Sequence, residues 1–179
     1  MASLIFRISS NGERVIEMVI AGEEAPDFVL ESDEEKQVSL KSYRGKKVVL
    51  YFYPKDGTPG CTTEALEFKD IADEFAKEDA VILGISKDSV ESHQKFKKKH
   101  KLPFTLLSDP EAKVLSEYGV WKEKSLYGKK FMGTERTTFL IDEQGIVRKI
   151  YRKVKPEGHA QICLLDLTKE PKLFLPEKE

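Results

Sequence analysis

The chain has 179 residues, which is enough for one domain with a sizeable hydrophobic core. Hydrophobic residues make up 40% of it and charged residues 34%, so the composition is that of a soluble globular protein and excludes a disordered one. The net charge is −1, with lysine and glutamate interspersed, and no basic face for nucleic acid is indicated.

Several kinds of location and site are also excluded. No apolar run is long enough to cross a bilayer and the N-terminus has no signal-peptide core, so we expect a cytoplasmic protein with no membrane partner. Two cysteines are too few for a disulfide framework, no Cys/His set has metal-ligand spacing, and no haem, flavin or nucleotide motif occurs. We therefore expect neither a metal nor a cofactor. The histidines, His93, His100 and His159, are expected at the surface or at helix ends.

Two β-prone runs open the chain, at residues 4–8 and 14–20. They flank Asn11-Gly12, the strongest short signal for a hairpin turn. We therefore expect residues 1–21 to form an N-terminal β-hairpin extension. A lone hairpin is marginally stable in water, so this one is expected to pack on the domain or on a partner subunit.

From residue 22 onward, β-prone runs alternate with runs of helical spacing. We expect strands at 28–30, 37–40, 47–53, 80–86, 104–107, 136–141 and 146–151. We expect helices from Cys61 to Phe75, from a capping box at Asp88 and Glu91 to His100, from Asp109-Pro110 to Gly119, and from His159 to Thr168. This alternation favours an α/β domain at 22–167, with a mixed central sheet and helices on both faces, and a C-terminal tail at 168–179.

The stretch from Lys47 to Phe75 combines a buried strand, a tight glycine- and proline-containing loop, and a helix. This order places Cys61 in or beside the first turn of the helix. Unpaired N–H groups and about half a positive charge at that helix end favour a thiolate, the nucleophilic form of cysteine. The alternative is that Cys61 is a small buried hydrophobe without chemistry, as most intracellular cysteines are.

Pro54, Thr58 and Cys61 form a Pro-x-x-x-Thr-x-x-Cys motif, which core packing does not require. The motif resembles the active-site signature of the peroxiredoxins. The flanking YFYPKDGTPGCTTEA and the later GVWKEKSLYGKKFMGTERTTFLIDEQG resemble the bacterioferritin comigratory protein (peroxiredoxin Q) branch. The resemblance covers roughly 22–167 and implies a thioredoxin-like fold in its peroxiredoxin form, with the active-site loop at the carboxyl end of a central strand. In that loop Pro54 would shield the sulfur and stiffen the backbone.

The resemblance implies an enzyme, a thioredoxin-dependent thiol peroxidase. It would reduce hydrogen peroxide and small organic hydroperoxides through a sulfenic acid on Cys61. Lowering a thiol pKa from roughly 8.5 to about 6 raises the thiolate fraction at neutral pH only about thirtyfold, whereas enzymes typically accelerate reactions about a million-fold or more. Groups that hold the peroxide and stabilise the developing charge must therefore supply most of the acceleration.

The resemblance also implies which groups these are. The Thr58 hydroxyl would bond both the sulfur and a peroxide oxygen, and the backbone amides of Gly60 and Cys61 would point into the same space. Arg136 matches the arginine that peroxiredoxins bring to the thiolate from a later strand, although on its own it would be an ordinary charge at a strand edge. Glu64 would order Arg136 through a carboxylate–guanidinium pair.

A sulfenic acid must be reduced by another thiol, and here the chain departs from its branch. Many members carry a second cysteine five residues after the first, where this chain has Leu66. Cys163 is the other thiol, and its leucine-rich helical surroundings favour a buried structural cysteine over a resolving one. We therefore expect a one-cysteine cycle completed by thioredoxin or another external thiol reductant, with a Cys61–Cys163 disulfide as the alternative.

A second function remains compatible with the same sequence. The chain would then be a redox-sensing or chaperone-like binding module, in which oxidation of Cys61 changes its partners. The sequence does not distinguish a monomer from a homodimer. Reaction of Cys61 with peroxide far faster than free cysteine would separate the enzyme from the module.

Overall fold

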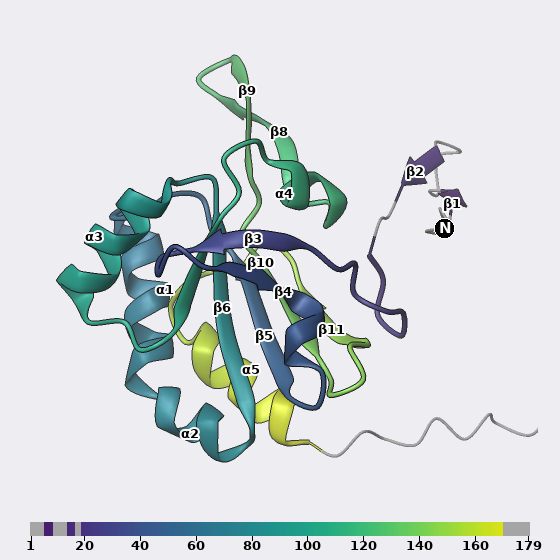
Figure 1. Ribbon diagram of the computed structural model, residues 1–179. Helices are drawn as coiled ribbons and strands as arrows, with labels where there is room; N and C mark the ends of the chain where they lie inside the picture. The colour runs from purple at the N-terminus through teal and green to yellow at the C-terminus, as the bar shows by residue number, and fades with distance from the viewer. Residues whose placement is uncertain (1–5, 9–13, 17–18, 170–179) are drawn as a thin grey trace, which may run out of the picture.

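The computed structural model of the chain describes residues 6–8, 14–16 and 19–169 (Figure 1). Its central sheet contains β3 (Val29–Ser32), β4 (Gln37–Ser39), β5 (Lys47–Phe52), β6 (Ala80–Ser86), β7 (Thr105–Ser108), β10 (Thr137–Ile141) and β11 (Val147–Tyr151). The helices are α1 (Pro59–Asp70), α2 (Ala72–Lys77), α3 (Val90–His100), α4 (Lys113–Glu117) and α5 (His159–Thr168), with a short 3₁₀ helix η1 (Leu40–Tyr43).

The strands lie in the order β11-β10-β5-β6-β7-β3-β4. The three inner strands β5, β6 and β7 run parallel, and the remaining pairs are antiparallel. The mixed sheet expected from the sequence is therefore confirmed. β10 pairs with β5 so that Thr137 stands opposite Phe52, which brings the residue before β10 next to the loop that follows β5.

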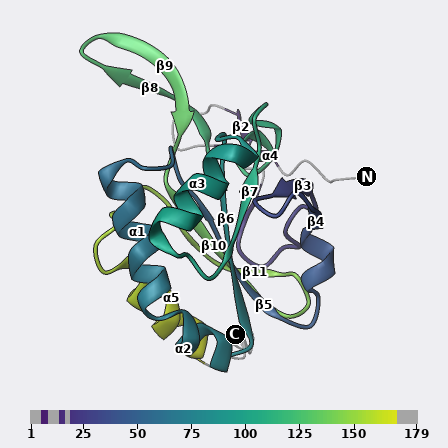
Figure 2. The same ribbon diagram turned by 60° about the vertical axis from the view of Figure 1, so that its left-hand side comes forward.

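Alternate residues of β5 point into two separate hydrophobic cores. Val48, Leu50 and Phe52 belong to a core with η1 and α4 on one face of the sheet. Val49, Tyr51 and Tyr53 belong to a core with α1, α2, α3 and α5 on the other face. Burial on both faces explains why this strand reads as a continuous apolar run rather than an alternating one, and it confirms that helices cover both faces (Figures 1 and 2).

Two of the expected helices differ from their expected bounds. The helix expected from Cys61 to Phe75 is divided into α1 and α2 at Ile71, whose φ of −118° is not helical. The helix expected from Asp109 begins later, at Lys113, although the Asp109 carboxylate still accepts hydrogen bonds from the helix backbone.

The expected capping box of the helix α3 is wrong. Ser89 caps this helix, because its hydroxyl oxygen accepts the backbone N–H of Ser92 at 3.1 Å. Glu91 forms an ion pair with Lys95 instead of bonding back to the cap. Asp88 is used elsewhere, as an acceptor for the active-site loop described below.

Two hairpins accompany the central sheet. β1 (Phe6–Ile8) and β2 (Arg14–Ile16) pair antiparallel, as expected, while the Asn11-Gly12 turn lies outside the described residues. The division of the chain at 1–21, 22–167 and 168–179 stays a prediction. No helix among the described residues is both long and apolar enough to cross a membrane.

The second hairpin was not expected from the sequence. It consists of β8 (Trp121–Leu126) and β9 (Lys129–Thr134) and projects from the sheet as an arm (Figures 1 and 2). Its turn residues Tyr127 and Gly128 both have positive φ, as in a type I′ turn. The hairpin ends at Thr134, two residues before Arg136, so its base lies beside the site described next.

Candidate active site

Cys61 occupies the first turn of α1, as expected. Thr58 is the N-cap, and the first helical hydrogen bond runs from the Thr62 amide to the Thr58 carbonyl at 2.9 Å. Within the described part of the chain, the amides of Gly60 and Cys61 have no hydrogen-bond acceptor. These unpaired donors leave the helix end electropositive beside a thiol that is only 1% exposed.

Arg136 connects this helix end to the start of β10. Its Nη2 donates to Cys61 Sγ at 3.4 Å, and its Nη1 donates to Glu64 Oε1 at 3.2 Å. One guanidinium therefore bridges the thiol and a carboxylate from the next turn of the same helix. The expected approach of Arg136 to Cys61 and its expected pairing with Glu64 are both present in this structure.

The Arg136–Glu64 pair is held in a largely dry environment. Glu64 is 1% exposed, and its Oε2 has no hydrogen-bond partner among the described residues. Burial raises the pKa of Glu64 to about 7, although Arg136 opposes this shift. Burial lowers the pKa of Arg136, but Glu64 and Cys61 outweigh it and hold that pKa above its usual value. The cation next to the sulfur is therefore permanent, while its carboxylate partner titrates near neutrality.

Gly60 gives Arg136 room to reach the sulfur. A Cβ atom at this position would lie 3.2 Å from Arg136 Nη2 and 3.4 Å from Pro156 Cγ. The first distance is shorter than ordinary van der Waals contact, so any larger residue would press on the guanidinium. From the sequence only the backbone amide of Gly60 was expected to contribute, and the structure adds this steric reason for a glycine.

Thr58 and Pro54 are placed on the loop as expected, but one expected contact is absent. The Thr58 hydroxyl donates to the Lys55 carbonyl at 2.9 Å, and its side chain is not bonded to Cys61 in this structure. Pro54 is exposed and lies two residues after the end of β5. Their roles as peroxide ligand and shield stay predictions.

Cys163 lies on α5, in the same hydrophobic core as Cys61. It is 0% exposed, and its Sγ lies 3.3 Å from His159 Nε2. Burial raises the pKa of the Cys163 thiol well above its usual range, and the charge of Glu64 adds to this effect. Both cysteines are free. These surroundings fit the buried structural cysteine favoured by the sequence.

The expectation that the histidines lie at the surface or at helix ends is wrong for His93, which is 0% exposed within α3. His159 begins α5, as expected, but it is only 4% exposed. Each is buried because its ring finds polar partners there: His159 Nε2 lies 2.8 Å from Thr138 Oγ1, and His93 lies against Asp56. Burial and the charge of Arg136 lower the pKa of His159 to about 4. His100 ends α3, as expected.

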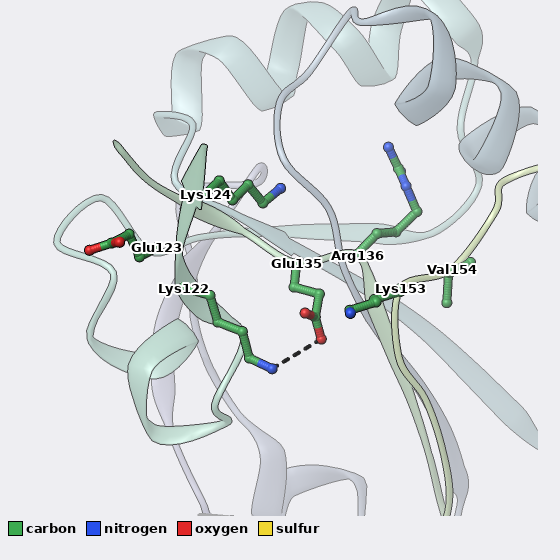
Figure 3. Close-up of a pocket in the computed structure, with 7 residues that line it drawn as sticks. All are labelled: Lys122, Glu123, Lys124, Glu135, Arg136, Lys153 and Val154. Carbon is green, nitrogen blue, oxygen red and sulfur yellow. Dashed lines mark hydrogen bonds and ion pairs between the residues drawn. The ribbon is translucent and has the colours of Figure 1, made fainter. Parts of the chain in front are cut away.

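A cavity of about 600 Å³ opens at the base of the β8–β9 hairpin (Figure 3). It is lined by Lys122, Glu123, Lys124, Glu135, Arg136, Lys153 and Val154. Arg136 is the residue shared with the Cys61 contacts, so the cavity adjoins this residue, whereas Cys61 does not line it. Sequence reasoning missed this cavity because it missed the hairpin.

Comparisons with known proteins agree with this geometry. The model of the AhpC/TSA family matches residues 21–150. The chain is 55% identical over 138 residues to a putative peroxiredoxin bcp of Coxiella burnetii, covering 77% of this chain and 91% of that protein. It is 53% identical over 146 residues to peroxiredoxin Bcp of Bacillus subtilis, covering 82% and 93%.

Solved structures give the same result. The bacterioferritin comigratory protein of Xanthomonas campestris, studied for alkyl peroxide reduction, is similar with a TM-score of 0.78 and 43% identity, covering 83% of this chain and 97% of that one. A PrxQ mutant of Xylella fastidiosa has a TM-score of 0.80 and 37% identity, covering 83% and 95%. The expected thioredoxin-like peroxiredoxin fold is confirmed. The chain belongs to the AhpC/TSA family, as a peroxiredoxin of the bacterioferritin comigratory protein branch.

Proposed function

We propose that this peroxiredoxin reduces hydrogen peroxide and small organic hydroperoxides at Cys61, in a one-cysteine cycle completed by an external thiol. The observation that carries the proposal is the 3.4 Å contact from Arg136 Nη2 to Cys61 Sγ at the N-terminus of α1. A cation and a helix N-terminus on one sulfur favour the thiolate, the form that attacks peroxide. The thiol is thus poised for reaction although it is buried.

In the proposed reaction the Cys61 thiolate attacks one peroxide oxygen and the O–O bond breaks. The sulfur keeps that oxygen as a sulfenic acid, and the other oxygen leaves as an alkoxide or hydroxide that takes up a proton. Negative charge therefore moves from sulfur to the departing oxygen. The fixed donors of Arg136 and of the Gly60 and Cys61 amides can stabilise that charge without reorganising. Thr58 would join them once its hydroxyl turns from Lys55.

Glu64 is proposed as a positioning residue rather than a reactant. Its ionised carboxylate orients the Arg136 guanidinium through the 3.2 Å hydrogen bond, so that Nη2 faces the sulfur. The same carboxylate competes with the thiolate for the cation, because both anions share one guanidinium. Partial protonation of Glu64 near neutral pH limits this competition.

The proposed cycle is completed from outside the chain. Leu66 occupies the helical position at which a branch-type resolving cysteine would stand, and Cys163 is buried beside a neutral histidine. An external thiol would attack the sulfenic acid and release water, and a second thiol would then reduce the mixed disulfide. Thioredoxin is the proposed reductant class, and a Cys61–Cys163 disulfide is the competing route.

Stopped-flow reaction of the reduced protein with one equivalent of peroxide tests the proposal. The wild type should react far faster than free cysteine, and Arg136→Ala should lose about 100-fold to 1,000-fold in rate, the usual loss for one preorganised donor. Arg148→Ala removes an exposed arginine on β11 and serves as the matched control, with no expected loss. A wild-type rate equal to that of free cysteine would instead support a redox-sensing or chaperone-like module.

A further inference from the structure

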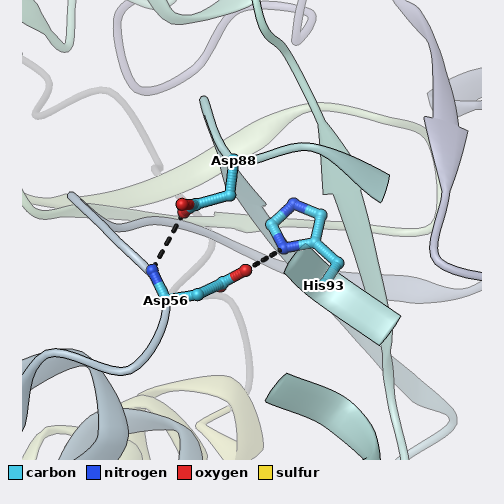
Figure 4. Close-up of side chains that lie close together, drawn as sticks. All are labelled: Asp56, Asp88 and His93. Carbon is cyan, nitrogen blue, oxygen red and sulfur yellow. Dashed lines mark hydrogen bonds and ion pairs between the residues drawn. The ribbon is translucent and has the colours of Figure 1, made fainter. Parts of the chain in front are cut away.

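A second polar cluster lies on the active-site loop, away from the Cys61 contacts. Its members are Asp56 between β5 and α1, Asp88 after β6, and His93 on α3 (Figure 4). One polar atom from each lies within 4.8 Å of the others. The reaction proposed above uses none of these side chains, although Asp56 stands midway between Pro54 and Thr58.

Hydrogen bonds connect the cluster to the elements around it. Asp88 Oδ2 accepts the Asp56 backbone N–H at 2.9 Å, and Asp56 Oδ1 accepts the Tyr53 hydroxyl at 2.7 Å. The Nε2 atom of His93 faces the carbonyl oxygen of Leu107 at 3.0 Å. The three residues are therefore linked by hydrogen bonds to Tyr53 directly after β5, to β7 and to one another.

Both ring nitrogens of His93 have hydrogen-bond partners. A carbonyl oxygen can only accept, so Nε2 carries a hydrogen toward Leu107. Nδ1 lies 2.8 Å from Asp56 Oδ2, and the same carboxylate also accepts the hydroxyls of Tyr53 and Ser92. The ring, which is 0% exposed, therefore faces an acceptor oxygen at each of its two nitrogens.

The contact between His93 and Asp56 anchors a loop that has few other attachments. The loop's backbone is tied at its ends, where the Tyr53 amide bonds to Ile85 and the Thr58 carbonyl accepts from α1. Across the interior of the loop, and counting only the described residues, every hydrogen bond to the rest of the molecule comes from Asp56. The Asp56 amide bonds to the end of β6, and its carboxylate bonds mainly to α3.

We propose that His93 is a positioning residue for peroxide reduction, holding Asp56 as a buried imidazolium and thereby fixing the loop that carries Pro54 and Thr58. The inference rests on the function proposed above, because the reaction gives this position its importance. Without the ion pair, the loop interior keeps the amide bond to Asp88 and two neutral hydroxyl bonds. A misplacement of about 1 Å can cost about 100-fold in rate, so a looser loop is sufficient to slow the reaction.

The test replaces His93 by glutamine, which is polar and of similar length but cannot carry the charge. Per titratable Cys61 thiol, His93→Gln should react with peroxide about 10-fold to 100-fold more slowly. Its Asp56 amide should also exchange with solvent faster than in the wild type. His100→Gln, the same substitution at the end of the same helix, should change neither quantity.

A spectroscopic readout separates charge from packing. Nitrogen-edited NMR of the histidine rings at neutral pH should show hydrogens on both nitrogens of His93 in the wild type, and on one alone in Asp56→Asn. A neutral His93 in the wild type, or an unchanged rate and amide exchange in His93→Gln, overturns the proposal and leaves the peroxidase function standing. Failure of the function is recognised separately, because the wild type itself would then react no faster than free cysteine.

Discussion

The two cysteines differ in their neighbours and not in their burial. Cys61 and Cys163 are 1% and 0% exposed and lie in the same hydrophobic core. Cys61 accepts a hydrogen bond from Arg136 at a helix N-terminus, whereas Cys163 lies in the second turn of α5 beside His159. The two sites differ in that a fixed positive charge lies beside Cys61 and not beside Cys163. The exposed fraction of a cysteine therefore does not by itself indicate the chemistry of its thiol.

His159 cannot replace the arginine. Burial and the charge of Arg136 keep its pKa near 4, so the ring is neutral at physiological pH. Burial therefore acts on Cys163 without a compensating cation in contact with the sulfur, and it raises that pKa strongly. The guanidinium, with its pKa above the usual value, stays charged at any working pH.

Replacing each cysteine by serine should reveal the largest difference between the two sites. Cys61→Ser should lose peroxide turnover completely, because no other thiol takes its place. Cys163→Ser should keep the rate of the first reaction and lose about 1–3 kcal/mol of stability, the cost of a poorly satisfied buried hydroxyl. Peroxide consumption and thermal unfolding measure the two effects. Loss of turnover in a folded Cys163→Ser protein would show that both thiols take part.

Gly60→Ala should weaken the cation–sulfur contact without touching either residue. Its Cβ would stand 3.2 Å from Arg136 Nη2, so the guanidinium must shift. We expect the peroxide reaction to slow about tenfold, within the range for small misplacements of a catalytic group. Thr63→Ala in the same helix is the control, since the Thr63 hydroxyl bonds only back to the Pro59 carbonyl. A wild-type rate in Gly60→Ala would contradict the steric reason given for this glycine.

Glu64→Gln should separate stability from activity. Because the folded-state pKa of Glu64, about 7, lies above the reference value of 4.5, the wild type loses stability as pH rises between these values. Glutamine does not titrate. The unfolding free energy of Glu64→Gln, measured relative to that of the wild type, should therefore increase by roughly 3 kcal/mol between pH 4 and pH 8. Its peroxide reaction should slow, because Arg136 loses its orienting carboxylate.

Chemical denaturation across this pH range measures the Glu64 effect. If the unfolding free energies of the two proteins differ by the same amount at every pH, Glu64 does not have a folded-state pKa near 7. Asp73→Asn, on the exposed side of α2, provides a control for the exchange of a carboxylate for an amide.

His159→Gln should have the smallest effect on reaction rate and a clear effect on acid stability. The folded-state pKa of about 4 lies below the reference value of 6.5, so stability is fully present above pH 6.5 and is lost as pH falls toward 4. The variant should lose less stability than the wild type over that interval. Urea unfolding at both ends of the interval measures this, and equal acid sensitivity in both proteins would refute it.

The sequence predicted the elements whose patterns are long and local. The strands β5 and β6 were found because burial on both faces leaves continuous apolar runs, and Cys61 was placed at a helix start by the strand–loop–helix order. The contact between Cys61 and Arg136 joins residues 75 positions apart, so local patterns could not supply it. It was expected only because of the resemblance to peroxiredoxins.

Other features depended on tertiary contacts that no local pattern encodes. The β8–β9 hairpin mixes charged and apolar residues along both strands, which hides its period, and Tyr127-Gly128 was the remaining signal. His93 looked like a surface residue of a lysine-rich helix. Its burial depends on Asp56, 37 positions earlier in the chain, and on a carbonyl of β7.

Peptide mass mapping after one equivalent of peroxide tests the contrast between the two thiols most directly. With a sulfenic-acid-specific trapping reagent present, the account predicts that Cys61 carries the trap and that Cys163 remains a free thiol. Equal oxidation of both cysteines, or a Cys61–Cys163 disulfide as the main product, would contradict it.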